Sequence, residues 1–165
     1  MSETNPEEFL PLHVNWFHIL LSLVGNFVGG RLSGYFLARG WSVNRSRKLA
    51  LLVFAVMAVP SFLAAYVTNL WVIVAVIGWA TFAHQAFSTL LFTTVTDVFP
   101  KEVVGSVTGF GSMFGAVGAA VITISVGYVI DAFGYTPLFF LGPVAYLIAL
   151  GVLHACNPRL APETV

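Results

Sequence analysis

Four long stretches without a single charged residue determine what this chain can fold into. They run over residues 9–30, 49–96, 103–130 and 132–158. A hydrocarbon core of about 30 Å needs about 20 helical residues to cross it, so the second stretch is long enough for two crossings. Thr68 and Asn69 mark the turn between these two. The sequence therefore predicts five membrane spans, at about residues 11–38, 49–67, 70–96, 103–130 and 135–155.

These runs predict an all-α fold, a multi-pass transmembrane helical bundle. They are continuous and much longer than the roughly ten-residue alternating segments of membrane β-barrels. The chain is 58% hydrophobic and 8% charged, against a charged fraction of about 25% in soluble domains. Residues 1–10 are expected to form a polar N-terminal segment and residues 159–165 a tail. Pro60 predicts a kink in the second span, with a neighbouring helix satisfying the freed carbonyl.

The distribution of charge predicts the orientation of the bundle. If successive loops lie on opposite sides of the membrane, all seven basic residues share one side: Arg31, Arg39, Arg45, Arg47, Lys48, Lys101 and Arg159. The positive-inside rule then places the N-terminus outside and the C-terminus in the cytoplasm of an inner (plasma) membrane protein. The expected partner is the lipid bilayer. The formal net charge of zero argues against a nucleic-acid partner, because phosphate binding needs a basic surface.

No arrangement of residues predicts an enzyme, a metal centre or a cofactor. Cys156 is the one cysteine, which excludes a disulfide framework and a multi-cysteine metal site. Asp97 and Glu102 flank one turn without a nucleophile or a histidine set to work with them. The segment GFGSMFG has neither the preceding strand nor the lysine of a phosphate-binding loop.

Polar side chains recur along the third predicted span. They are Thr81, Gln85, Ser88, Thr89, Thr93 and Thr96, with His84 beside Gln85. One interpretation is a helix that lines an aqueous substrate pathway. The other is polar packing between helices, in which threonine and serine also bond to their own backbone. Buried polar groups at mid-membrane depth are costly, which favours a function for His84 and Gln85.

Two further segments are candidates for a role in conformational change. The fourth span carries small residues that permit close helix approach: Gly105, Gly109, Gly111, Gly115 and Gly118. The basic turn at residues 29–48 carries candidates for a cytoplasmic gating latch, Gly30, Arg39, Arg45 and Arg47, with Asp97 as an acidic partner. The alternative interpretation of this turn is charge that only sets topology.

Three motifs in order resemble the C-terminal half of Major Facilitator Superfamily transporters, in the anion:cation symporter branch that contains hexuronate and aldonate transporters. They are GWSVNRSRK (residues 40–48), HQAFSTLLFT (residues 84–93) and DVFPKEVVGSVTGFGSMFGAVG (residues 97–118). The resemblance covers residues 22–158. It implies that the five spans correspond to helices eight to twelve of a twelve-helix fold built from two six-helix halves.

The resemblance also implies roles for particular residues. His84, Gln85 and Ser88 match positions that face the central cavity, and Thr89 stands where a polar residue is common, so these four are candidate substrate contacts. Gly34 stands where an aspartate is usual in the basic loop. The implied function is proton-coupled symport of a small organic anion, by a chain expected to be inactive alone. The alternatives are half of a split transporter completed by a separate N-terminal chain, and a small membrane scaffold.

Overall fold

The chain folds into helices only, as the sequence predicts. The computed structural model describes residues 6–158 and 160, with side chains from Trp16 onward. Within these residues there is no strand. The elements are α1 (Pro6–Ala38), α2 (Val43–Met57), the 3-10 helix η1 (Val59–Ala65), α3 (Leu70–Val98), α4 (Lys101–Phe133) and α5 (Thr136–Cys156).

Among the described residues, four segments are long and apolar enough to cross a membrane. They are Val43–Ala65, which joins α2 to η1, and the helices α3, α4 and α5. Helix α1 is not among them, so a first crossing at residues 11–38 stays a prediction. Helix α1 also begins at Pro6, inside the segment expected to be merely polar. The predicted tail lies outside the described residues, except for Leu160.

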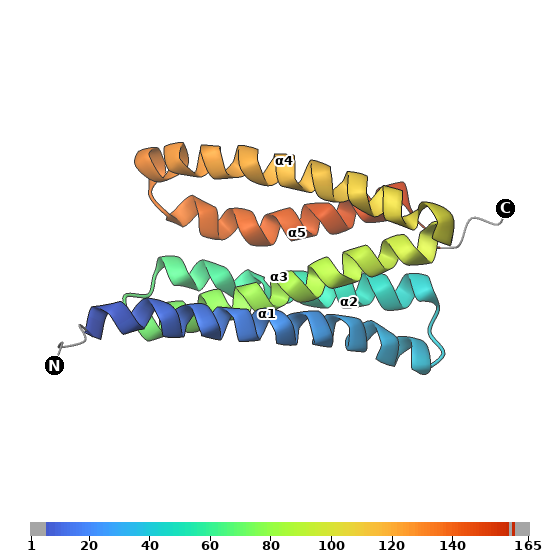
Figure 1. The fold of residues 1–165 in the computed structure, drawn as a ribbon, viewed down its shortest axis with the longest axis horizontal. Coiled ribbons are helices and arrows are strands. Elements are labelled where there is room, and N and C mark those ends of the chain that lie inside the picture. The colour runs from blue at the N-terminus through green and yellow to red at the C-terminus, as the bar shows by residue number, and fades with distance from the viewer. Residues whose placement is uncertain (1–5, 159, 161–165) are drawn as a thin grey trace.

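The helices lie along one long axis (Figure 1). Helices α1, α2 and α3 pack together, α5 packs mainly against α2 and η1, and α4 lies on the outside with few contacts to α3 and α5. The core lies between α2 and α3, where its fully buried side chains come from Ala50, Leu51, Phe54, Ala55, Ala86, Phe87 and Leu90. Helix α5 reaches this core through residues such as Tyr146 and Leu150, whereas α4 touches the bundle only sparsely.

Two glycines allow α1 to lie directly against α3. A Cβ atom added to Gly25 would come within 2.5 Å of the carbonyl oxygen of Phe82, and one added to Gly29 within 2.6 Å of that of Ala86. These distances leave no room for any side chain. Backbone contact of this kind is the usual function of small residues between membrane helices.

The expected disturbance at Pro60 is a break rather than a kink. Helix α2 ends at Met57 and the chain continues as the 3-10 helix η1. The tighter winding leaves the carbonyl of Met57 without a helical partner, since the amide of Ser61 bonds to Ala58 instead. The indole Nε1–H of Trp79, on α3, donates to this carbonyl at 2.8 Å. A neighbouring helix thus satisfies the group that the break exposes.

The α1–α2 and α3–α4 turns lie at the same end of the bundle (Figure 1). Gly40 closes the first turn with a φ of +82°, and Ser42 caps α2 by accepting from the amide of Arg45. The second turn passes through Pro100. This arrangement gathers Arg39, Arg45, Arg47, Lys48 and Lys101 at one end, which we call the basic end.

Candidate functional site

A buried arginine at the basic end ties three helices together. The Arg47 side chain donates from Nε to Oδ2 of Asp97 at 2.6 Å and from Nη2 to Oδ1 at 3.3 Å. A third donor, Nη1, bonds to the hydroxyl of Ser33. Arg47 lies near the start of α2, Asp97 near the end of α3 and Ser33 in the last turns of α1. This bidentate ion pair and the bond to Ser33 therefore join the ends of all three helices. Ser33 is fully buried and Arg47 is 8% exposed.

The position of Arg47 explains why it, and not a neighbouring arginine, is buried. Residues 47, 50, 51 and 54 follow helical spacing, and Ala50, Leu51 and Phe54 form the core face of α2. Arg47 therefore extends the buried face by one turn towards the basic end. This spacing is visible in the sequence, although the basic turn alone does not single out one arginine.

The other residues of the predicted latch do not meet Asp97. The Arg39 guanidinium lies 4.5 Å from the centre of the Tyr35 ring, and that of Arg45 lies 4.5 Å from the centre of the Trp41 ring. Gly30 is exposed, and a Cβ there would touch nothing within 4 Å. Of the five candidates, the structure brings only Arg47 and Asp97 together.

The polar residues of α3 divide between two neighbouring helices. His84 Nδ1 lies 2.6 Å from the hydroxyl of Tyr146 on α5. The hydroxyl of Thr89 donates to Oδ1 of Asn26 on α1 at 2.6 Å. Because five residues turn a helix by about 140° beyond one full turn, His84 and Thr89 belong to different faces. Sequence reasoning identified neither Tyr146 nor Asn26 as a partner.

The remaining polar residues of α3 differ in their hydrogen bonding. Thr81 and Thr93 donate to the backbone carbonyls of Ile77 and Thr89, four residues earlier, which is ordinary local bonding. Gln85 and Ser88 are half-buried. Around the helix they lie between His84 and Thr89, which make the two interhelical contacts.

The glycine residues of α4 face open space. A Cβ added at any of them would meet nothing within 4 Å, which holds for Gly105, Gly109, Gly111, Gly115 and Gly118. None of the residues of α4 is buried. Gly25 and Gly29 of α1 are the opposite case, because their close contact is already made. The close helix approach predicted for α4 is therefore not made within this chain's described residues.

No metal centre is present in the described part of the chain. No three histidine, cysteine, aspartate or glutamate side chains gather there closely enough to hold an ion. What the geometry offers instead is hydrogen bonding from amide, hydroxyl and imidazole groups along α3, and one ion pair at the basic end. These are means of binding a polar solute and of fastening helix ends.

Apolar helices long enough to cross a membrane, with a buried ion pair at one end, define an integral membrane protein of the helical-bundle class. The chain belongs to the Major Facilitator Superfamily, whose family model matches residues 12–163. The resemblance of the three motifs to this family is thereby confirmed.

Similar proteins are named as sugar-acid transporters. The probable galactarate/D-glucarate transporter GarP of Escherichia coli K12 is 30% identical over 112 residues, covering 68% of this chain and 25% of that protein. The hexuronate transporter of the same strain is 31% identical over 126 residues, covering 75% and 29%. The probable galactarate/D-glucarate transporter GudP of Bacillus subtilis 168 is 27% identical over 141 residues, covering 84% and 31%.

The family and these names indicate a transporter and not an enzyme, as the sequence predicts. The chain matches less than a third of the length of each of these relatives.

Proposed function

We propose that this chain forms part of a carrier that moves a small organic anion of the sugar-acid type together with protons. The relatives' names supply the substrate class. In carriers built from two bundles, alternating access arises as one bundle rocks against the other around a central site. The chain contributes the last five helices of such a carrier, with its N-terminus outside and its C-terminus in the cytoplasm of the inner membrane.

The observation that carries this proposal is the bare surface of α4. A helix of 33 residues has none of them buried, and its glycines are open to contact. Lipid can cover an apolar exposed surface, but glycines on a membrane helix favour a closely packed neighbouring helix. A second bundle supplies that neighbour, and small residues let it slide during the change of access.

The candidate substrate contacts are His84, Gln85, Ser88 and Thr89. Gln85 and Ser88 can donate to the hydroxyl and carboxylate oxygens of a sugar acid. His84 and Thr89 already bond to Tyr146 and to α1, so they also hold α3 in place beside its neighbours. In this proposal the Arg47 and Asp97 pair fastens the basic end while that end is closed.

Uptake measurements test the proposal directly. The full chain is expressed in cells that lack sugar-acid carriers, either alone or with a segment of GarP that contains its first seven helices, and uptake of labelled D-glucarate is measured. We expect uptake only with both chains, and a loss of at least tenfold for Gln85→Ala. Lys101→Ala, an exposed change at the basic end, serves as the control. Uptake by the chain alone would contradict the requirement for a second bundle.

The coupling ion is tested in the same cells. Proton symport predicts uptake that rises when the external medium is acidified and stops when a protonophore is added. Uptake that instead follows an imposed sodium gradient would overturn proton coupling and leave the carrier role standing.

The open α4 surface also favours the related possibility that a separately encoded N-terminal chain completes the carrier. Such a partner would copurify with this chain from native membranes and would contain several apolar spans. Copurification with an unrelated membrane complex, without any effect of Gln85→Ala, would indicate a scaffold instead.

A further inference from the structure

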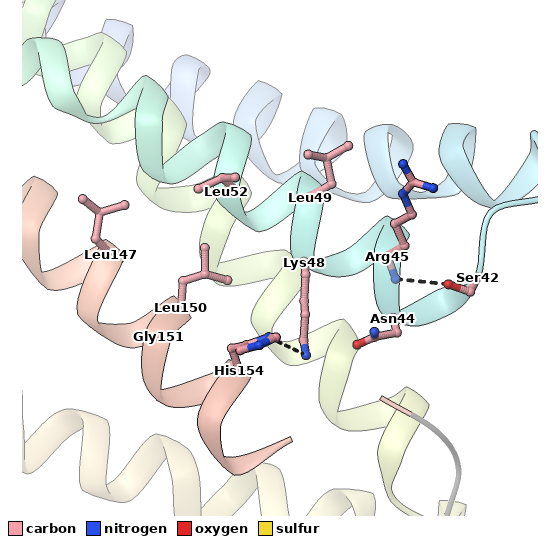
Figure 2. A pocket seen from close by; sticks show the side chains of 10 residues that line it. All are labelled: Ser42, Asn44, Arg45, Lys48, Leu49, Leu52, Leu147, Leu150, Gly151 and His154. Atoms are coloured by element: carbon pink, nitrogen blue, oxygen red, sulfur yellow. Dashed lines mark hydrogen bonds between the residues drawn. The ribbon is translucent and has the colours of Figure 1, made fainter. Parts of the chain in front are cut away.

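A groove with one basic end runs along the outside of the bundle between α2 and α5 (Figure 2). Its volume is about 810 Å³. Leu49 and Leu52 of α2 and Leu147 and Leu150 of α5 form its apolar floor. Leu52 and Leu147 are 40% and 45% exposed, so this floor faces the surroundings of the bundle.

The groove has a fixed polarity because the two helices run in opposite directions. Residues 45, 48, 49 and 52 share one face of α2, and residues 147, 150, 151 and 154 share one face of α5. Helix α2 begins, and α5 ends, at the basic end. Lys48 and His154 therefore meet at that end of the groove, while the leucines continue towards the middle of the membrane (Figure 2).

Among the described residues, dipoles rather than a carboxylate contact the ammonium of Lys48. Its ammonium donates to the carbonyl oxygens of Asn157 and Pro158 at 2.7 and 2.9 Å. It also lies 3.1 Å from Nδ1 of His154. An ammonium can only donate, so Nδ1 accepts and Nε2 of His154 carries the hydrogen. The ion pair within the described residues joins Arg47 and Asp97, so no carboxylate of the described part of the chain pairs with Lys48.

We propose that this groove binds an anionic phospholipid from the leaflet at the basic end. The phosphate accepts from the Nε2–H of His154 and lies beside the positive charge of Lys48, and one acyl chain lies along the four leucines. Charge and surface both fit, since a lipid is the one abundant ligand in the membrane with an anion next to a long apolar chain. Basic pockets between membrane helices are suited to such head groups. Arg45 adds positive charge nearby, although its guanidinium points away from Lys48, towards Trp41 (Figure 2).

Two single substitutions test the charge of the groove and its apolar floor separately. Lys48→Gln removes the charge and keeps the apolar floor. Gly151→Leu fills the floor and keeps every charge, because a Cβ at Gly151 meets nothing within 4 Å. Lys101→Gln is the matched charge control at the same end of the bundle. Gly142→Leu is the matched glycine control, since it lies on the same helix, outside the groove, and is equally unobstructed.

The test is native mass spectrometry of the purified full chain with phosphatidylglycerol or phosphatidylcholine of identical acyl chains. We expect wild-type protein to retain phosphatidylglycerol about fivefold better. Lys48→Gln should abolish this preference, Gly151→Leu should reduce retention of phosphatidylglycerol, and both controls should match wild type. Circular dichroism verifies helix content, and if Lys48→Gln fails to fold, the pair of glycine variants decides.

Three results would overturn the proposal. The first is equal retention of the two lipids by wild-type protein. The second is a loss of retention in Lys101→Gln or Gly142→Leu as large as in the groove variants. The third is complete displacement of the lipid by inorganic phosphate at equal concentration, which would show that the site recognises a soluble anion.

Discussion

At the scale of single residues, the Arg47 and Asp97 pair should contribute most clearly to stability. Asp97→Asn leaves the Arg47 guanidinium buried without its counter-charge, and breaking a buried pair from one side costs about 3 kcal/mol. We expect Asp97→Asn to lower the free energy of unfolding by about that amount. Arg39→Gln removes a cation that lies over the exposed Tyr35 ring, and should cost about 0.5 kcal/mol. Chemical unfolding in detergent, followed by circular dichroism, measures both.

Replacing both partners tests whether the stability lost in Asp97→Asn comes from the unpaired, buried charge of Arg47. The double variant Arg47→Met with Asp97→Leu leaves no unpaired charge, and such apolar replacements are often close to neutral in stability. We expect it to recover most of the stability lost in Asp97→Asn. If Asp97→Asn proves as harmless as Arg39→Gln, the pair does not hold the three helix ends.

Residue identity at this site was only partly predictable. The sequence indicated that an arginine of the basic turn pairs with Asp97, because acids are scarce at that end. It did not indicate Ser33 as the third partner, which depends on how closely α1 approaches α2 and α3. The split of His84 from Thr89 was missed for a related reason. His84 and Thr89 are polar residues of the same helix, but helix packing, and not their spacing alone, determines which neighbouring helix each one contacts.

At the scale of elements, glycines on two helices should respond in opposite ways to the same change. Gly29→Ala forces a methyl group against the backbone of Ala86, and overpacking of this kind costs about 1 to 3 kcal/mol. Gly109→Ala meets nothing within 4 Å, so the higher helix propensity of alanine should stabilise the chain by up to about 1 kcal/mol. Thermal unfolding of the purified chain compares them. Equal effects would argue against the close contact of α1 with α3.

The break between α2 and η1 gives a second prediction for an element. Trp79→Phe removes the donor to the carbonyl of Met57 and should cost about 1 kcal/mol. In a Pro60→Ala background the helix can continue through this point, so the loss from Trp79→Phe should shrink. An unchanged loss in both backgrounds would show that Trp79 acts through packing alone. The double-mutant cycle is measured by thermal unfolding, with circular dichroism as the signal.

Most helix bounds follow from the sequence because lipid requires long apolar helices. The prediction for residues 70–96 differs from α3 by two residues at one end, and that for residues 135–155 differs from α5 by one at each. The exceptions have local causes. Helix α2 begins six residues before the predicted span, because Ser42 caps it ahead of the charged turn. The 3-10 helix after Met57 has Pro60 in its first turn, and the donor that satisfies the exposed carbonyl, Trp79, is distant in sequence.

At the scale of the whole molecule, the main feature is how little α4 is packed compared with the other helices. The core lies between α2 and α3, whereas α4 is a full-length helix without a buried residue. Stability of the chain should therefore depend little on the glycines of α4. Assembly with a second bundle should depend on it strongly, because only small residues let helix backbones approach closely.

This contrast gives the last prediction. In the isolated chain, the double variant Gly111→Leu with Gly115→Leu should change the free energy of unfolding by no more than about 0.5 kcal/mol, as for an unobstructed surface site. The same variant should lose copurification with the segment of GarP that contains its first seven helices, and D-glucarate uptake should fall with it. Gly142→Leu, on α5, should preserve both. If the α4 variant assembles and transports normally, the open glycine face is in contact with lipid and the partner bundle docks elsewhere.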